Sequence, residues 1–211
     1  MSDKDIEKLN FLKSNEETFY EENVKYLAGI DEAGRGPLAG PVVVGAVIMP
    51  RDSRIEGIND SKKISEKKRE KLYEQITEEA IAWGVGIVDQ NQIDELNILN
   101  ATKEAVTMAI KSLETKPDLI LVDALTNIDT CGIPYKSIIK GDANEYSIAA
   151  ASIIAKVTRD RIMYEWDKIY PDYGFAKHKG YGTAAHIAKI KEVGPCMIHR
   201  KSFIKNFTKD I

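Results

Sequence analysis

The sequence is poor in cysteine, histidine and tryptophan, with two cysteines, three histidines and two tryptophans in 211 residues. Cys131 and Cys196 form no CxxC pair, which excludes a disulfide framework and a cysteine-rich zinc site and leaves reduced thiols as the expectation. The longest apolar run, Val42 to Pro50, is far shorter than the roughly 20 residues of a membrane-spanning helix. We therefore expect no membrane association.

The chain also lacks an internal repeat, a low-complexity tract and a linker rich in proline, glycine or serine. Its N-terminus has neither the apolar segment nor the cleavage site of a secretory signal, so we expect a cytoplasmic protein. Apolar residues make up 43% and charged residues 30%, which is close to the average for soluble domains. These values predict one globular domain with a substantial core, and we expect it to be a monomer.

The formal net charge is only −3, from 30 basic and 33 acidic side chains, but these charges are unevenly distributed. Residues 156–211 contain 12 basic and 6 acidic side chains, a net +6, whereas residues 1–155 contain 18 and 27, a net −9. Because a local field depends on nearby charges, the C-terminal part could face a polyanion. The alternative is that these charges are solvated helix faces.

Hydrophobic patterns predict an α/β domain. The expected strands lie at about 26–32, 41–49, 81–88, 119–122 and 135–139, and the expected helices at about 65–79, 92–115, 144–168 and 182–193, with part of 4–20 also helical. The strands are almost continuously apolar, which indicates a mixed sheet covered by helices on both faces. We expect Trp83 and Trp166 in the core, and the three histidines at the surface or in hydrogen bonds, not as metal ligands.

A glycine-rich turn follows the first predicted strand. Residues 27–41 contain four glycines and two prolines around the adjacent acids Asp31 and Glu32. The turn matches neither a Walker A loop nor GxGxxG. Backbone without Cβ flanks Arg35, so another backbone could approach closely; the alternative is a tight hairpin connection.

Four carboxylates stand where a fold could bring them together. Asp31 and Glu32 end one apolar strand, Asp123 ends another, and Asp142 precedes a helix. Two of them also have a structural interpretation: Asp123 as a turn residue, and Asp142 as an N-cap in a capping box with Glu145. Oxygen ligands without convergent histidine or cysteine are typical of Mg²⁺ or Mn²⁺, and two such ions can promote in-line displacement at a phosphodiester.

Seven segments together resemble type 2 ribonuclease H in its bacterial branch, the ribonuclease HII family. They occur in order over about 26–203, at 29–37, 59–63, 94–99, 140–142, 149–160, 173–181 and 200–203. The resemblance implies a ribonuclease H-like mixed five-stranded sheet flanked by helices, with a helical C-terminal extension. Residues 1–25 would be an N-terminal helical extension, and residues 26–211 the catalytic domain, with a substrate-binding part at about 165–211.

The resemblance also implies an activity: metal-dependent hydrolysis of the RNA strand of RNA/DNA hybrids, and cleavage on the 5′ side of single ribonucleotides in duplex DNA. The products would carry 3′-hydroxyl and 5′-phosphate ends, and two Mg²⁺ or Mn²⁺ ions would take part. Two alternatives stay open. One is another nuclease of the same fold, such as a resolvase, and the other is a non-catalytic nucleic-acid-binding module.

Site residues follow by motif match. The resemblance assigns catalysis and metal binding to Asp31, Glu32, Asp123 and Asp142; recognition of the ribose 2′-hydroxyl to Gly34, Arg35, Gly36 and Tyr181; and phosphate contact to Asn59, Ser61 and Lys62. Further candidates for substrate contact are Lys156, Lys177, Lys179 and Arg200; for Lys156 the alternative is an ion pair with an acid of the site. The 2′-hydroxyl distinguishes RNA from DNA, which fits an approach surface without Cβ atoms. We expect the basic run from Lys67 onward to be a solvated helix face.

Overall fold

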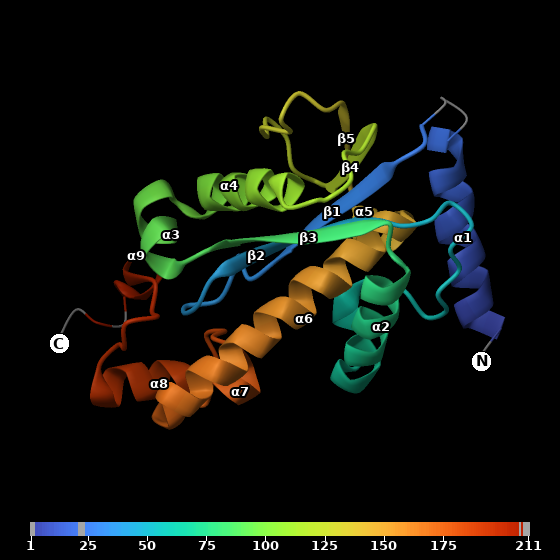
Figure 1. The fold of residues 1–211 in the computed structure, drawn as a ribbon. Helices are drawn as coiled ribbons and strands as arrows, with labels where there is room; N and C mark the ends of the chain where they lie inside the picture. The colour runs from blue at the N-terminus through green and yellow to red at the C-terminus, as the bar shows by residue number, and fades with distance from the viewer. Residues whose placement is uncertain (1–2, 21–23, 207, 209–211) are drawn as a thin grey trace.

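In the computed structural model, which describes residues 3–20, 24–206 and 208, a mixed sheet forms the centre of the molecule (Figure 1). The described residues form five strands in the order β3-β2-β1-β4-β5. Their bounds are β1 (Leu27–Ala33), β2 (Val42–Ile48), β3 (Ala82–Val88), β4 (Leu119–Asp123) and β5 (Tyr135–Ile138). Strands β1, β2 and β3 pair antiparallel, whereas β4 is parallel to both β1 and β5. The predicted mixed α/β sheet is confirmed.

Helices cover both faces of this sheet and extend beyond one end of it (Figure 1). They are α1 (Asp3–Tyr20), α2 (Glu66–Glu79), α3 (Gln90–Leu96), α4 (Ile98–Lys111), α5 (Gly141–Asn144), α6 (Tyr146–Ile169), α7 (Phe175–His178), α8 (Ala184–Val193) and α9 (Lys201–Ile204), with 3₁₀ turns η1 (Ser61–Lys63) and η2 (Pro171–Tyr173). Helix α4 packs on one face and α6 on the other. Among the described residues, no helix combines the length and the apolar character needed to cross a bilayer.

Strand β2 shows why the apolar runs are continuous. Successive side chains of a strand point to opposite faces. Val44 and Ala46 accordingly join the core beneath α4, whereas Val47 joins the core beneath α6. Both faces are apolar because both are buried. Strand β3 lies at the sheet edge, where its Trp83 remains 38% exposed, so the expectation that Trp83 is a core residue was wrong.

The long predicted helix over 92–115 is divided in the structure. Asn97, with φ of 66°, separates α3 from α4, and its side chain accepts hydrogen bonds from the backbone N–H groups of Leu99 and Asn100. A positive φ combined with a ψ of 161° is a conformation that side chains disfavour, but asparagine is a strong N-cap residue. The continuous apolar periodicity concealed the break because both helices contribute apolar side chains.

The start of α6 lies unusually close to β1. A Cβ atom added to Gly29 would lie 2.1 Å from the backbone of Ser147, so only glycine permits this contact. Helix α1 packs over the same region: Leu12 is fully buried, and Glu16 accepts a hydrogen bond from the Ser147 N–H at 2.7 Å. The α5–α6 junction is thereby fixed between β1 and α1.

Candidate active site

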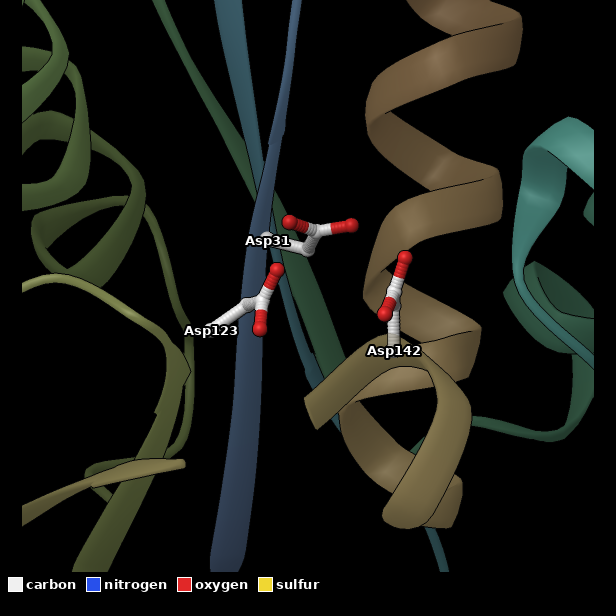
Figure 2. A group of neighbouring side chains, drawn as sticks. All are labelled: Asp31, Asp123 and Asp142. Atoms are coloured by element: carbon white, nitrogen blue, oxygen red, sulfur yellow. The ribbon is translucent and has the colours of Figure 1, made fainter. Parts of the chain in front are cut away.

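Three aspartates converge where β4 ends beside β1 (Figure 2). Asp31 lies on β1 and Asp123 ends β4; because these parallel strands pair Ile30 with Val122, the next residue of each strand is an aspartate beside the other. Asp142 comes from α5, which faces them across the edge of β1. One carboxylate oxygen from each residue lies within 4.8 Å of the others. The structure therefore brings together three of the four predicted acids.

This arrangement concentrates negative charge in a buried place. Burial raises the pKa of Asp31 well above its usual range, and the neighbouring Glu32 and Asp123 raise it further. Burial also raises the pKa of Asp123, against the effect of the Gly141 N–H that donates to Asp123 Oδ1 at 2.7 Å. Mutually destabilised carboxylates of this kind are typical of sites that bind a cation.

Glu32 lies beside the three aspartates but outside their group. Its Oε1 accepts a hydrogen bond from Arg35 Nη1 at 3.3 Å, while its buried Oε2 accepts none from the described residues. Burial raises the pKa of Glu32, although Arg35 opposes the shift. An oxygen-only donor set with an unpartnered buried oxygen fits a hard divalent ion such as Mg²⁺ or Mn²⁺.

Asp142 does not cap a helix through its side chain. Lys140, in the left-handed region with φ of 57°, precedes α5, and Glu145 begins α6 without a side-chain cap bond. The α6 N–H group at Ser147 is instead bonded by Glu16 from α1. The alternative interpretation of a capping box was wrong, and the Asp142 carboxylate faces the other acids, with Lys62 Nζ 3.6 Å away.

Two buried arginines bind the backbone carbonyl groups of the glycine-rich turn. Arg200, fully buried, donates to the carbonyl oxygens of Gly34, Arg35, Gly40 and Pro41 at 2.6–3.2 Å. Arg159, which is 1% exposed, donates to the carbonyls of Ala39, Pro41 and Lys179 at 2.9–3.1 Å. The prediction that Arg200 contacts substrate is corrected here, because its guanidinium is enclosed by backbone carbonyls. Arg159 had no sequence signal beyond its place in a matched segment.

These bonds also set the direction of the peptide groups above them. In a trans peptide the carbonyl and the following N–H point in opposite directions. Since Arg200 binds the carbonyls of Gly34 and Arg35, the N–H groups of Arg35 and Gly36 point away from Arg200. Gly34 has φ of 97°, a conformation that side chains disfavour, and an added Cβ would lie 2.1 Å from Arg159 Nε.

A pocket of about 230 Å³ lies beside this turn. It is lined by Glu32, Ala33, Gly34, Arg35, Gly36, Ser61, Lys62, Lys156 and Tyr181. Tyr181 is 43% exposed, and a Cβ added to Gly36 would lie 3.8 Å from its ring. The pocket thus joins the glycine backbone, an aromatic ring and one of the acids.

A second, more open pocket of about 470 Å³ lies on the other side of Lys62. Asp123 and Asp142 line it together with Lys63 and Lys140. Lys62 lines both pockets. Burial lowers the pKa of Lys62, but the surrounding carboxylates, led by Asp31, raise it by more. The lysine therefore stays protonated between the two pockets.

The turn that carries Asn59, Ser61 and Lys62 is anchored by a residue that sequence reasoning missed. Arg69 Nη1 donates to the Ser61 carbonyl at 3.0 Å and also to the Ile64 carbonyl, and Arg69 Nη2 pairs with the buried Asp160 at 3.6 Å. The expectation of a solvated face from Lys67 onward was therefore wrong for Arg69.

The remaining lysine candidates differ in placement. Lys156 lines the smaller pocket but pairs with Asp160 at 2.6 Å, not with an acid of the cluster. Lys179 is buried, with its Nζ bonded to the Ala176 carbonyl and 4.0 Å from the centre of the Tyr164 ring. Lys177 is exposed. Of these three lysines, only Lys156 lines one of the two pockets described above.

Comparison with known proteins identifies the family of this chain. The family model described as Ribonuclease HII matches residues 28–206. The chain belongs to the ribonuclease HII family. A ribonuclease HII from Acetivibrio thermocellus is 60% identical over 91% of this chain and 75% of the relative, and one from Ruminiclostridium cellulolyticum is 56% identical over 98% and 81%. A crystal structure of ribonuclease H2 from Pyrococcus horikoshii, 29% identical, has a TM-score of 0.72 over 88% of this chain and 100% of that one.

Membership confirms the family resemblance and the predicted enzyme class, since ribonuclease HII is an RNA–DNA hybrid endoribonuclease. The converged aspartates are consistent with the metal dependence expected of such an enzyme. The roles of individual residues stay predictions, and they are argued from geometry below.

Proposed function

We propose that this ribonuclease HII cleaves on the 5′ side of ribonucleotides in RNA/DNA hybrids and in DNA duplexes with a single ribonucleotide, leaving 3′-hydroxyl and 5′-phosphate ends. The proposal rests on one observation: the acid cluster and the pocket beside the glycine-rich turn adjoin each other. Glu32, an acid next to the converged aspartates, lines the same pocket as the glycine backbone and Tyr181. The proposed ribose-binding pocket therefore adjoins the proposed hydrolytic centre.

Asp31, Asp123 and Asp142, with Glu32 beside them, would hold the divalent ions, which we propose to be two Mg²⁺ or Mn²⁺. When bound, such ions lower the pKa of water and stabilise the leaving oxygen of an in-line phosphodiester displacement. The protein would contribute fixed carboxylates. Asp123 is oriented by the Gly141 N–H, and Asp31 Oδ1 accepts the Glu32 N–H at 2.8 Å. These bonds hold the acids in place before any ion binds.

Recognition of the substrate would be shared among three groups. The outward N–H groups of Arg35 and Gly36 can donate to the 2′-hydroxyl oxygen, and Tyr181 closes the opposite side of the pocket. Lys62, exposed between the pockets, can bind the phosphate beside the aspartates. A deoxyribose would leave the two N–H donors without their partner, and an unpaired donor in an occupied site weakens binding of the wrong substrate.

Cleavage of three duplexes tests the proposal: all DNA, DNA with one ribonucleotide, and an RNA/DNA hybrid, each with Mg²⁺ or Mn²⁺. We expect cuts 5′ to ribonucleotides and none in the all-DNA duplex. Asp123→Asn should lower cleavage by orders of magnitude while duplex binding persists, and Asp52→Asn, at an exposed position away from both pockets, should leave both unchanged.

Two outcomes would exclude the proposal. Equal cleavage of the all-DNA duplex would indicate a resolvase-like nuclease of the same fold. Binding without cleavage by the wild-type chain would indicate a non-catalytic module.

A further inference from the structure

The three histidines of the chain gather beside Tyr181, outside the acid cluster. His186 is fully buried and His199 is 3% exposed, and their Nε2 atoms lie 3.0 Å apart. His186 Nδ1 lies 2.9 Å from the Tyr181 carbonyl oxygen, and His199 Nδ1 lies 3.0 Å from the Cys196 backbone nitrogen. A chain of hydrogen bonds therefore joins residue 196 to residue 181 through two imidazoles.

The Tyr181 carbonyl at one end fixes the direction of the bonds in this chain. A carbonyl oxygen only accepts, so His186 Nδ1 carries a proton and donates to Tyr181. Neutral His186 then has an unprotonated Nε2, which accepts from His199 Nε2–H. Neutral His199 is therefore unprotonated at Nδ1, which accepts from the Cys196 N–H at 3.0 Å and lies 3.2 Å from both the Sγ and the carbonyl oxygen of Cys196. Each neutral ring thus has one definite tautomer.

Charge would break this pattern, because two protonated Nε2 atoms would face each other at 3.0 Å. Burial lowers the pKa of both His186 and His199 to about 4, so both rings are neutral at physiological pH. His178 stacks on His186 with ring centres 4.3 Å apart, and its own two nitrogens are bonded to the Tyr173 carbonyl and the Gly180 N–H. The earlier expectation of hydrogen-bonding histidines is confirmed, but His186 and His199 are not at the surface.

The accepting carbonyl belongs to a residue whose ring is partly exposed. Tyr181 is 43% exposed, and its ring borders Gly36 across the pocket. Its backbone is confined: the Tyr181 N–H donates to the His178 carbonyl, and a Cβ added to Gly180 would lie 2.5 Å from the Ala39 carbonyl. The Tyr181 carbonyl accepts from the Thr183 N–H at 2.8 Å and from His186 Nδ1 at 2.9 Å, and the two bonds together fix the peptide plane from which the ring projects.

We propose that His186 is a positioning residue for ribose recognition, which holds Tyr181 against the Gly34–Gly36 turn through its Nδ1–H, and that His199 selects the tautomer that makes this bond. The inference rests on the proposed role of Tyr181. It has a structural counterpart in Arg200, the neighbour of His199, which orients the opposite wall of the pocket. Residues 199 and 200 therefore organise both walls.

Two substitutions at His186 separate its two nitrogens. The side-chain amide of His186→Asn can occupy the position of Nδ1 and still donate to Tyr181, but it cannot reach His199. The longer His186→Gln places its amide near Nε2, so it can meet His199, but it removes the side-chain donor to the Tyr181 carbonyl, which then keeps only the Thr183 N–H. Both replace a buried imidazole with an amide, and each serves as the matched control of the other for stability.

Kinetics on a duplex with one ribonucleotide give the main test. We expect His186→Gln to lower kcat at least tenfold, whereas His186→Asn stays within about threefold of wild type, because misplacement of a positioning group by about 1 Å can cost on the order of a hundredfold. Duplex affinity should be unchanged in both, since phosphate contacts dominate it. Equal losses in the two variants would overturn the proposal.

A double-mutant cycle with Tyr181→Ala distinguishes positioning from general stabilisation. If His186 acts through Tyr181, adding His186→Gln to Tyr181→Ala should cause no further loss of kcat. A full additional loss would refute the inference while leaving the role of Tyr181 intact. An unchanged kcat in Tyr181→Ala itself would instead show that the proposed role of Tyr181 is wrong.

Long-range ¹H–¹⁵N NMR of the wild-type protein tests the tautomers directly. We expect His186 with its proton on Nδ1 and His199 with its proton on Nε2 at neutral pH. In His199→Phe, His186 Nε2 loses its donor, so the Nε2–H tautomer of His186 should become detectable beside the Nδ1–H form. Detection of a charged His186 at neutral pH, or of a proton on His199 Nδ1, would contradict the assignment.

Discussion

Neutralising Asp31 should stabilise the metal-free protein. Asp31 is 5% exposed and lies among acids, with Asp123 and Asp142 within 4.8 Å. Asp31→Asn keeps the shape of the side chain and the bond that Oδ1 accepts from the Glu32 N–H, while it removes the charge. We expect a higher melting temperature than wild type in the presence of a chelator, together with a loss of cleavage.

The magnitude follows from the geometry. Two unit charges 4.8 Å apart repel by about 3.5 kcal/mol at an effective dielectric constant of about 20, so the loss of one charge from a fully ionised trio would remove about 7 kcal/mol of repulsion. Partial protonation already relieves much of this repulsion in the wild type, as the raised pKa of Asp31 indicates. A net gain of about 1–2 kcal/mol remains, which corresponds to about 3–6 °C in Tm for a chain of this size.

The pH dependence has a definite sign. Because the folded pKa of Asp31 is raised, the folded state binds a proton that the unfolded state has released, and wild-type stability falls as pH rises. The difference in Tm between Asp31→Asn and wild type should therefore grow from about pH 4, the ordinary pKa of aspartate, and level off above the raised pKa.

Asp160→Asn is the matched control. Asp160 is 3% exposed, as buried as Asp31, but its carboxylate pairs with Lys156 at 2.6 Å and with Arg69 at 3.6 Å. Removing its charge should destabilise the protein by about 3 kcal/mol, since breaking a buried pair leaves its cations unpaired. Thermal melts in chelator over pH 4–8 should thus give opposite shifts for the two variants. A lower Tm for Asp31→Asn would refute the argument from mutual repulsion.

Three further predictions concern residues outside the acid cluster. Arg200→Lys should lower kcat/KM at least tenfold with duplex affinity within threefold in a binding assay, because one ammonium cannot orient both the Gly34 and Arg35 carbonyls. Glu16→Ala should lower the free energy of unfolding in urea by about 1–2 kcal/mol, since it removes the acceptor for the first turn of α6. Asn97→Ala should lose at least about 1 kcal/mol in the same assay, and Asn97→Gly less, because glycine accepts a φ of 66° without strain.

Local pattern was sufficient to locate the strands, because each strand is specified by its own run of apolar residues. The strands were located to within one or two residues: the predicted segment 41–49, for example, is β2 at Val42–Ile48. The break at Asn97 was missed, since it depends on one backbone conformation and not on hydrophobicity. The exposure of Trp83 was missed because strand order, which places β3 at an edge, is a tertiary property.

The acids of the site could be predicted from the sequence because their residue type indicates their chemistry. The residues that position the site could not be predicted in this way. The acids at strand ends stand out in the sequence, because a charge at the end of a buried apolar strand is costly unless it is paired or bound to a metal. Arg69, Arg159 and Arg200 resemble surface cations in any linear sequence, and only the fold shows that their partners are backbone carbonyls. The histidine chain had no signal at all, since residues 186 and 199 come from separate segments.

The charge distribution takes on a different meaning once burial is known. The net +6 of residues 156–211 suggested that this part faces the duplex, yet Arg159, Arg200 and Lys179 are buried on backbone carbonyls, and Lys156 is paired with Asp160. Cations that are enclosed and already bonded attract a polyanion less than exposed ones. The lysines that line the open pocket beside the aspartates are Lys62, Lys63 and Lys140, all from the net-negative part of the chain. Phosphate attraction near the centre should therefore depend on these three lysines, and the salt dependence of duplex binding should weaken more in Lys62→Ala than in Lys156→Ala.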